Sequence, residues 1–131
     1  MTDRYKFRGK RLDNGIWAHG SLVQYYGGNT RIFAGCSLGR PVDPATVGQC
    51  TGMRDAKGRL IYEGDIVRYS HPFMGRTGVY EVVYDEHEFT GKGFWITHHD
   101  NPGDMLGEGA SYLECIGNIH DDPEMLIEKE G

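Results

Sequence analysis

The sequence lacks several features that would place it in a specialised class of protein. Its 131 residues hold no apolar run near the ~18 residues of a membrane helix. Its first ten residues, MTDRYKFRGK, contain no apolar segment of the signal-peptide type. Cysteine is scarce: Cys36, Cys50 and Cys115 are an odd, widely spaced set without a CxxC pair, which favours reduced thiols. We therefore expect a cytoplasmic protein that does not enter a membrane.

Motifs of known enzymes and metal sites are also missing. The chain has no HExxH, GxSxG, P-loop or EF-hand pattern. Two histidine clusters, at residues 98–100 and 120–122, are typical of solvated loop edges, because adjacent strand residues point to opposite faces. Cys36, in AGCSLG, would act as a nucleophile only beside a base that the sequence does not identify. We predict a protein that is not an enzyme, without catalytic residues, metal site or cofactor.

No window of twelve or more residues sustains an amphipathic helical pattern, whereas glycine is abundant. The chain has 20 glycines in 131 residues, roughly twice the usual share of ~7%. These glycines separate short aromatic and β-branched runs, which indicates many turns and short strands. We predict a single all-β domain over residues 1–131, with a small, barrel-like, strongly bent sheet, SH3-like elements and a short C-terminal helical turn.

Local signals place the elements of this sheet. Asn14-Gly15 is the strongest hairpin signal in the chain, because both residue types tolerate positive φ. Asp43-Pro44 and Asp122-Pro123 fit helical turns with an Asp cap and Pro in the first turn. The alternation in GVYEVVYD indicates a central strand with apolar side chains on both faces. The predicted strands cover residues 4–8, 16–26, 30–37, 78–85, 94–99 and 112–120, and the glycine-rich residues 99–111 are predicted to form a mobile loop.

A basic segment, RYKFRGKRL, covers residues 4–12. On a strand its alternate cations share one face, and Tyr5 and Phe7 share the other. This pattern is typical of an edge strand with one buried and one solvated side, whose charges prevent edge-to-edge aggregation. The alternative is a nucleic-acid contact made by Arg4, Lys6, Arg8, Lys10 and Arg11.

The most patterned run is VGQCTGMRDAKGRLIYEGDIV, residues 47–67. Residues 55–58 fit a type I turn that ends on a left-handed glycine. Glu63 and Asp65 flank Gly64, and two carboxylates on one face of a strand could act as a catalytic acid–base pair. A glycine at positive φ, beside an acid that caps the turn, is however a frequent start of a strand in SH3-like barrels. We interpret Gly58, Glu63, Gly64 and Asp65 as a structural turn motif.

Four blocks of the chain resemble the YopX family, small proteins found mostly in phages and prophages of bacteria. YKFRGKRLDNGIWAHGSLVQY is similar to the family's opening, and residues 47–67 resemble its most specific block, V-G-Q-Y-T-G-L-x-D-x-x-G-x-x-I-Y-E-G-D-I-V. GVYEVVYDEHEF and LECIGNIHDDPEML resemble its central strand and its closing segment. Cys50 stands where the family has tyrosine, and Met53 and Met125 replace leucines, changes that affect packing. The resemblance implies a mainly β, barrel-like fold and no established catalytic activity.

These observations lead to two functional hypotheses. The first is a phage or prophage accessory protein in the bacterial host cytoplasm, which binds an unknown protein partner or forms a homo-oligomer. The alternative is a nucleic-acid-binding module that uses the basic N-terminal segment. The net charge of −5 argues mildly against a duplex DNA binder. A contiguous basic groove lined by Tyr or Trp would favour the alternative.

Overall fold

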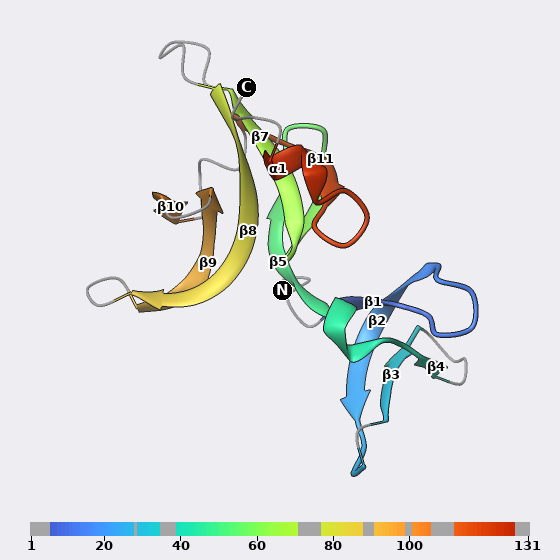
Figure 1. The fold of residues 1–131 in the computed structure, drawn as a ribbon. Helices are drawn as coiled ribbons and strands as arrows, with labels where there is room; N and C mark the ends of the chain where they lie inside the picture. The colour runs from blue at the N-terminus through green and yellow to red at the C-terminus, as the bar shows by residue number, and fades with distance from the viewer. Residues whose placement is uncertain are drawn as a thin grey trace. The chain divides into compact units, whose positions relative to one another are not determined.

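The described part of the chain consists mostly of antiparallel strands (Figure 1). The structure is a computed structural model that describes residues 6–27, 29–34, 39–70, 77–87, 91–98, 101–105 and 112–127. The predicted all-β class with one short helix is confirmed. Contacts within the chain divide it into two compact units, which we call unit 1 (residues 1–52) and unit 2 (residues 53–131). The single domain predicted from the sequence stays a prediction.

Unit 1 contains an antiparallel sheet with the strand order β4-β3-β2-β1-β5. A 3-10 helix, η1 (Pro44–Thr46), joins β4 to β5, and the Asp43 side chain caps it by accepting a hydrogen bond from Ala45 N (3.0 Å). The predicted helical turn at Asp43-Pro44 is therefore confirmed. The strands are β1 (Phe7–Lys10), β2 (Trp17–Gln24), β3 (Thr30–Phe33), β4 (Arg40–Pro41) and β5 (Gly48–Arg54), the last of which continues into unit 2.

The turn between β1 and β2 sets the register of this sheet. Gly15 has φ 72°, and Asn14 Oδ1 accepts a hydrogen bond from Ile16 N (2.9 Å). The predicted hairpin is confirmed, and it places Lys10 opposite Trp17. The predicted edge position of the first strand is wrong, because β5 pairs with the other side of β1 and puts Gly48 opposite Arg8. The reason is a long-range pairing that local alternation does not reveal.

The inner face of the unit 1 sheet forms a small core. Ile32 and Val42 are buried there, and Thr30 is buried beside them. Gly9 lies on this face without room for a side chain, since a Cβ there would lie 3.1 Å from Val42. Along β2 and β3 the opposite face is the more exposed one.

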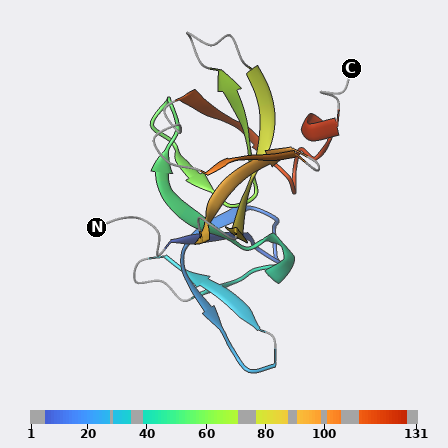
Figure 2. The same ribbon diagram turned by 90° about the vertical axis from the view of Figure 1, so that its left-hand side faces the viewer.

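Unit 2 contains a second antiparallel sheet with the strand order β10-β9-β8-β7-β11. β8 pairs with β7 on one side and β9 on the other, so the predicted central strand is confirmed. β8 and β9 curve strongly, which agrees with the predicted bent sheet (Figure 1 and Figure 2). The elements of this unit are β6 (Leu60–Tyr62), β7 (Asp65–Ser70), β8 (Thr77–His87), β9 (Gly91–His98), β10 (Asn101–Met105), β11 (Leu113–Asn118) and α1 (Glu124–Ile127).

Two predictions for unit 2 need correction. The predicted loop at residues 99–111 contains the strand β10, which pairs with β9; residues 99–100 and 106–111 lie outside the described residues. Pro102 is compatible with β10 because this strand is at the edge of the sheet. Asp122 precedes α1 and its carbonyl accepts from Met125 N, but its side chain accepts from Asn118 N (3.3 Å) and does not cap the helix as predicted.

The core of unit 2 lies under β7, β8, β9 and β11. Side chains along these strands point alternately to opposite faces, so each strand contributes one or two buried apolar residues to the core. Tyr69 and Tyr80 pack against this core from its rim. Its buried members are Ile61, Val67, Val82, Ile96, Leu113 and Cys115.

Candidate functional site

The turn between β6 and β7 carries the Glu-Gly-Asp motif. Gly64 has φ 94°, so the positive φ predicted for it is confirmed. Its N–H donates to Val82 O (2.8 Å), and its carbonyl accepts from Ile119 N (2.9 Å). Gly58, in the preceding hairpin loop, has φ 85°, also as predicted. The backbone of Gly64 therefore ties the turn to β8 and to the residue that follows β11.

Asp65 is buried at the start of β7, with 5% of its surface exposed. Its Oδ2 accepts a hydrogen bond from Tyr62 N (2.7 Å) and lies 3.6 Å from Cys115 Sγ. The hydrogen bond from Tyr62 N closes the turn, which is the role predicted for Asp65 as part of a structural turn motif. Burial is the main cause that raises the pKa of Glu81, and the negative charge of Glu63 raises it further.

Asp55 is a structural residue that the sequence did not single out. Its Oδ1 accepts from Lys57 N (2.9 Å) and Arg59 N (2.9 Å), and its Oδ2 accepts from Cys115 N (3.0 Å). Burial alone would raise the pKa of Asp55, but hydrogen bonds from the N–H groups of Cys115, Arg59 and Lys57 outweigh it and lower the pKa. The sequence indicates the turn at residues 55–58, but it does not indicate the contact between Asp55 and Cys115, because the two residues are 60 positions apart.

Cys115 and the two acids form what we call the Asp55–Asp65–Cys115 cluster. Burial, followed by the charges of Asp65 and Asp55, raises the pKa of the Cys115 thiol far above its ordinary value. A thiol that stays protonated is a poor nucleophile and a poor metal ligand. The cluster thus joins the hairpin loop, the turn motif and β11, because its two carboxylates accept hydrogen bonds from backbone N–H groups and from the Cys115 thiol.

The remaining chemical candidates have no assembled site in the described part of the chain. Cys36, His99 and Asp100 lie outside it, and Cys50 is buried in unit 1. Within the described ranges, no group of three His, Cys, Asp or Glu residues could hold a metal ion. Among the same residues, no helix has the length and apolar character required to cross a membrane.

Charge is distributed unequally between the two units. Unit 1 contains seven Lys and Arg against three Asp, a formal net charge of +4, although the whole chain is negative. Unit 2 contains seven Lys and Arg against sixteen Asp and Glu, which gives −9. An asymmetry of this kind is typical of proteins that contact an anionic partner with one part of the chain.

The cations of unit 1 gather on one face of its sheet, which we call the outer face. Directly opposed residues of an antiparallel pair share a face. The registers place Lys10 opposite Trp17 and Arg8 opposite His19. Along β2, His19, Ser21 and Val23 of this face are exposed, whereas Gly20 and Leu22 between them are half-buried. The outer face comprises Arg8, Lys10, Trp17, His19, Ser21, Val23, Arg31 and Phe33.

Trp17 is the centre of the cationic part of this face. The Arg8 guanidinium lies 4.7 Å from the centroid of the Trp17 ring, and the Lys10 ammonium lies 5.6 Å from it. Arg8 is only 8% exposed, so the solvated position predicted for it is wrong: its side chain is covered and stacks on the indole. The hairpin predicted at Asn14-Gly15 could have indicated from the sequence that Lys10 lies opposite Trp17.

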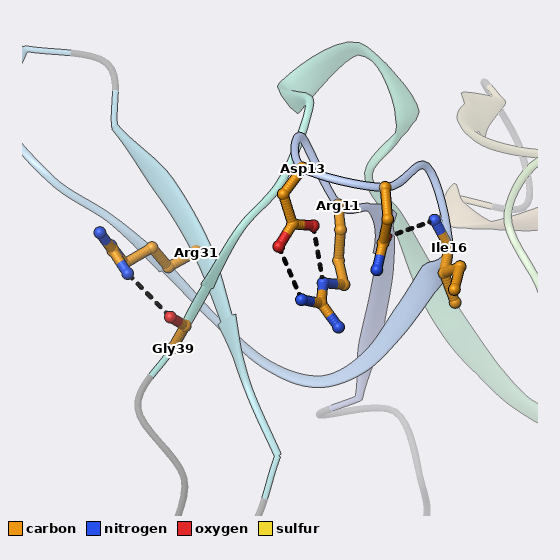
Figure 3. A network of polar contacts seen from close by, with 6 residues as sticks. Arg11, Asp13, Ile16, Arg31 and Gly39 are labelled. Carbon is orange, nitrogen blue, oxygen red and sulfur yellow. Dashed lines mark hydrogen bonds and ion pairs between the residues drawn. The ribbon is translucent and has the colours of Figure 1, made fainter.

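The other predicted cations differ in their surroundings. Arg11 Nε and Nη2 donate to the two carboxylate oxygens of Asp13 (3.0 and 2.7 Å), which compensates its charge within the turn (Figure 3). Arg31 comes from β3 and was missed by the sequence; its Nη1 donates to Gly39 O (2.7 Å), as Figure 3 shows. Lys6 precedes β1 and is half-buried, and Arg4 lies outside the described residues.

Apolar side chains are exposed at both hairpin ends of unit 1. Leu12 and Ile16 flank the β1–β2 turn with 65% and 61% of their surface exposed. Tyr25 and Tyr26 follow β2, and Tyr26 is fully exposed. Exposed apolar groups mark an interaction site when they form a contiguous patch.

The fold and these contacts define an all-β protein of two antiparallel sheets, in which the motif residues build the fold and unit 1 carries a cationic, aromatic face. The chain belongs to the YopX protein family, whose model matches residues 6–127. Protein EF1440 from Enterococcus faecalis, known from a crystal structure, has a similar fold. Its TM-score is 0.57 at 21% identity, over 92% of this chain and 96% of that one. No curated protein matches the chain.

Proposed function

We propose that the protein is a phage or prophage accessory protein that acts by binding rather than by catalysis. The outer face of unit 1 is its binding surface, and the bacterial cytoplasm is its compartment. The phage origin follows from the resemblance of the four sequence blocks to the YopX family. The binding role follows from how the polar side chains of the two units are used.

One contrast carries this proposal. The conspicuous acids of unit 2, Asp55 and Asp65, are buried and accept hydrogen bonds from backbone N–H groups, and the buried Cys115 thiol donates to Asp65 Oδ2. On the outer face of unit 1, by contrast, Lys10 and Trp17 are partly exposed and His19 is exposed. Aromatic side chains and arginine are enriched in protein interfaces relative to the rest of the surface, and this supports a binding role for the outer face.

Affinity capture from host cells tests the proposal. The tagged protein, a Lys10→Glu variant and a matched Lys57→Glu variant would each be incubated with lysate, with and without nuclease. Lys57 belongs to unit 2 and is exposed, so its variant repeats the charge change at a residue that is not part of the outer face. The proposal predicts a macromolecule that Lys10→Glu no longer captures and Lys57→Glu still captures. If no captured molecule distinguishes the two variants, the outer face is not the binding surface.

A homo-oligomer is a second form of this function, supported by the exposed hairpin ends. Leu12, Ile16, Tyr25 and Tyr26 would be covered in such an assembly, at a gain of about 25 cal/mol per Å² of apolar surface. Light scattering on the purified protein tests it. A dimer that a Leu12→Ser/Ile16→Ser variant converts to a monomer supports an oligomer, and a monomeric wild type at every concentration contradicts it.

A further inference from the structure

The outer face of unit 1 interleaves cations with aromatic rings. Lys10 faces Trp17 across β1 and β2, and Arg31 faces Val23 across β2 and β3, next to Phe33. Strands β1, β2 and β3 contain no Asp or Glu. The two carboxylates in the described residues of unit 1 lie in turns, where Asp13 pairs with Arg11 and Asp43 caps η1. The strands of this face therefore carry cationic side chains and no anionic ones.

We propose that this outer face binds single-stranded nucleic acid, a partner class that rests on the binding function proposed above. Lys10 and Arg31 contact the phosphates, and bases stack on the aromatic rings at the face. Proteins that bind single strands combine a cationic track with aromatic side chains on which successive bases stack. The charge of +4 on unit 1, against −9 on unit 2, restricts a polyanion to unit 1.

The aromatic residues extend along β2. Trp17 is at the start of the strand, and Tyr25 follows Val23 by two residues, so the alternation places it on the same side. The Tyr25 N–H donates to Asn29 O, which continues the β2–β3 pairing past Gln24. Eight residues of strand span about 26 Å, enough for the shortest single-strand sites of about four nucleotides.

A single strand fits this face better than a duplex. Aromatic rings stack on bases only when the bases are unpaired, as in single-stranded loops and ends. Sheet proteins that read a duplex insert strands into one of its grooves, and duplex binders usually carry a strongly basic face, whereas this chain is negative overall. The experiment therefore compares a single strand with its own duplex.

Fluorescence anisotropy with a labelled mixed-sequence oligonucleotide of about twelve nucleotides tests the inference. The expected result is binding at low salt that weakens along a log–log slope of about −0.7 per phosphate contact. Two contacts, from Lys10 and Arg31, give about −1.4, so a fourfold increase in salt weakens binding roughly sevenfold. The duplex of the same sequence should bind several-fold more weakly than the single strand.

Two variants locate the site. Lys10→Gln should weaken binding and reduce the salt slope by about 0.7, whereas the matched Lys57→Gln variant in unit 2 should change neither. Tyr25→Ala should weaken binding at least about fivefold through lost stacking, and its exposed side chain makes the substitution safe for folding. Circular dichroism confirms that each variant is folded.

Three results would overturn the inference: no binding at low salt, equal binding of duplex and single strand, or equal effects of Lys10→Gln and Lys57→Gln. The proposed binding function is tested separately. If wild type captures a nuclease-resistant protein partner that Lys10→Glu no longer captures, the outer face remains a binding surface, but nucleic acid is not its ligand.

Discussion

Asp55 should be one of the residues on which the stability of unit 2 depends most. Its carboxylate accepts three backbone hydrogen bonds, from Lys57, Arg59 and Cys115, and it is almost fully buried. In an Asp55→Ala variant the buried Cys115 N–H loses its acceptor, which costs about 1–3 kcal/mol. The N–H groups of Lys57 and Arg59 lie in an exposed loop where water can replace the carboxylate, so each loss costs about 0.5–1 kcal/mol. The expected loss is about 2–5 kcal/mol of a total of ~5–15 kcal/mol.

Urea unfolding followed by Trp95 fluorescence measures this loss. Trp95 is buried in unit 2, and a Trp17→Phe background removes the signal of the other tryptophan. The midpoint should fall while the slope with urea concentration stays constant. Asp121→Ala is the matched control, because Asp121 is an exposed acid of the same unit whose Oδ2 accepts a surface bond from Asn118 Nδ2 (3.1 Å). It should change stability by no more than about 0.5–1 kcal/mol.

The pH dependence gives an independent check of the same contacts. The pKa of Asp55 is lowered in the folded protein, so its stabilisation is complete above the unfolded value of about 3.9. That stabilisation is lost as pH falls through the folded pKa. The difference between wild type and Asp55→Ala should therefore shrink below about pH 4. A loss for Asp55→Ala no larger than for Asp121→Ala at pH 7 would refute the reasoning.

Three further predictions concern unit 2. Gly64→Val should cost about 1–3 kcal/mol, because a β-branched residue is strained at φ 94°; urea unfolding measures it, and a loss under about 0.5 kcal/mol would contradict it. Burial and the charge of Glu63 raise the pKa of Glu81, so ionisation of Glu81 destabilises the fold as pH rises through the folded pKa. Glu81→Gln removes this ionisable group and should therefore raise the melting temperature at pH 7. This gain should vanish below about pH 4, and an equal gain at both pH values would point to another cause. Cys115 should resist a thiol reagent in the folded protein and react after denaturation without reductant, as peptide mapping would show; rapid labelling of the native protein would contradict its burial and raised pKa.

Local chemistry predicted the turns of this protein. The Asn14-Gly15 hairpin and the positive φ of Gly58 and Gly64 follow from residue types that tolerate left-handed backbone. Asp43-Pro44 likewise predicted the cap of η1. These features depend on a few adjacent residues, so a single sequence contains all the information they need.

Long-range pairing accounts for what the sequence missed. The bond between Asp55 and Cys115 joins residues far apart, and the pairing of β1 with β5 turns a predicted edge strand into an internal one. Arg8 was predicted to be solvated for the same reason, since alternation within β1 assigns its face but not what covers that face. Residues 101–105 were predicted to be loop because their Gly and Pro signals are local, whereas pairing with β9 makes them a strand.

Chemical-shift mapping tests the central claim, that this protein binds a partner through the outer face of unit 1. The isotope-labelled protein would be titrated with the single-stranded oligonucleotide at low salt, and backbone amide shifts would be followed in both units. The account predicts shifts concentrated in β1, β2 and β3, strongest around Lys10, Trp17 and Arg31. Shifts centred on Glu63, Gly64 and Asp65, with the outer face unchanged, would contradict it and return the Glu-Gly-Asp turn to first place as the functional site.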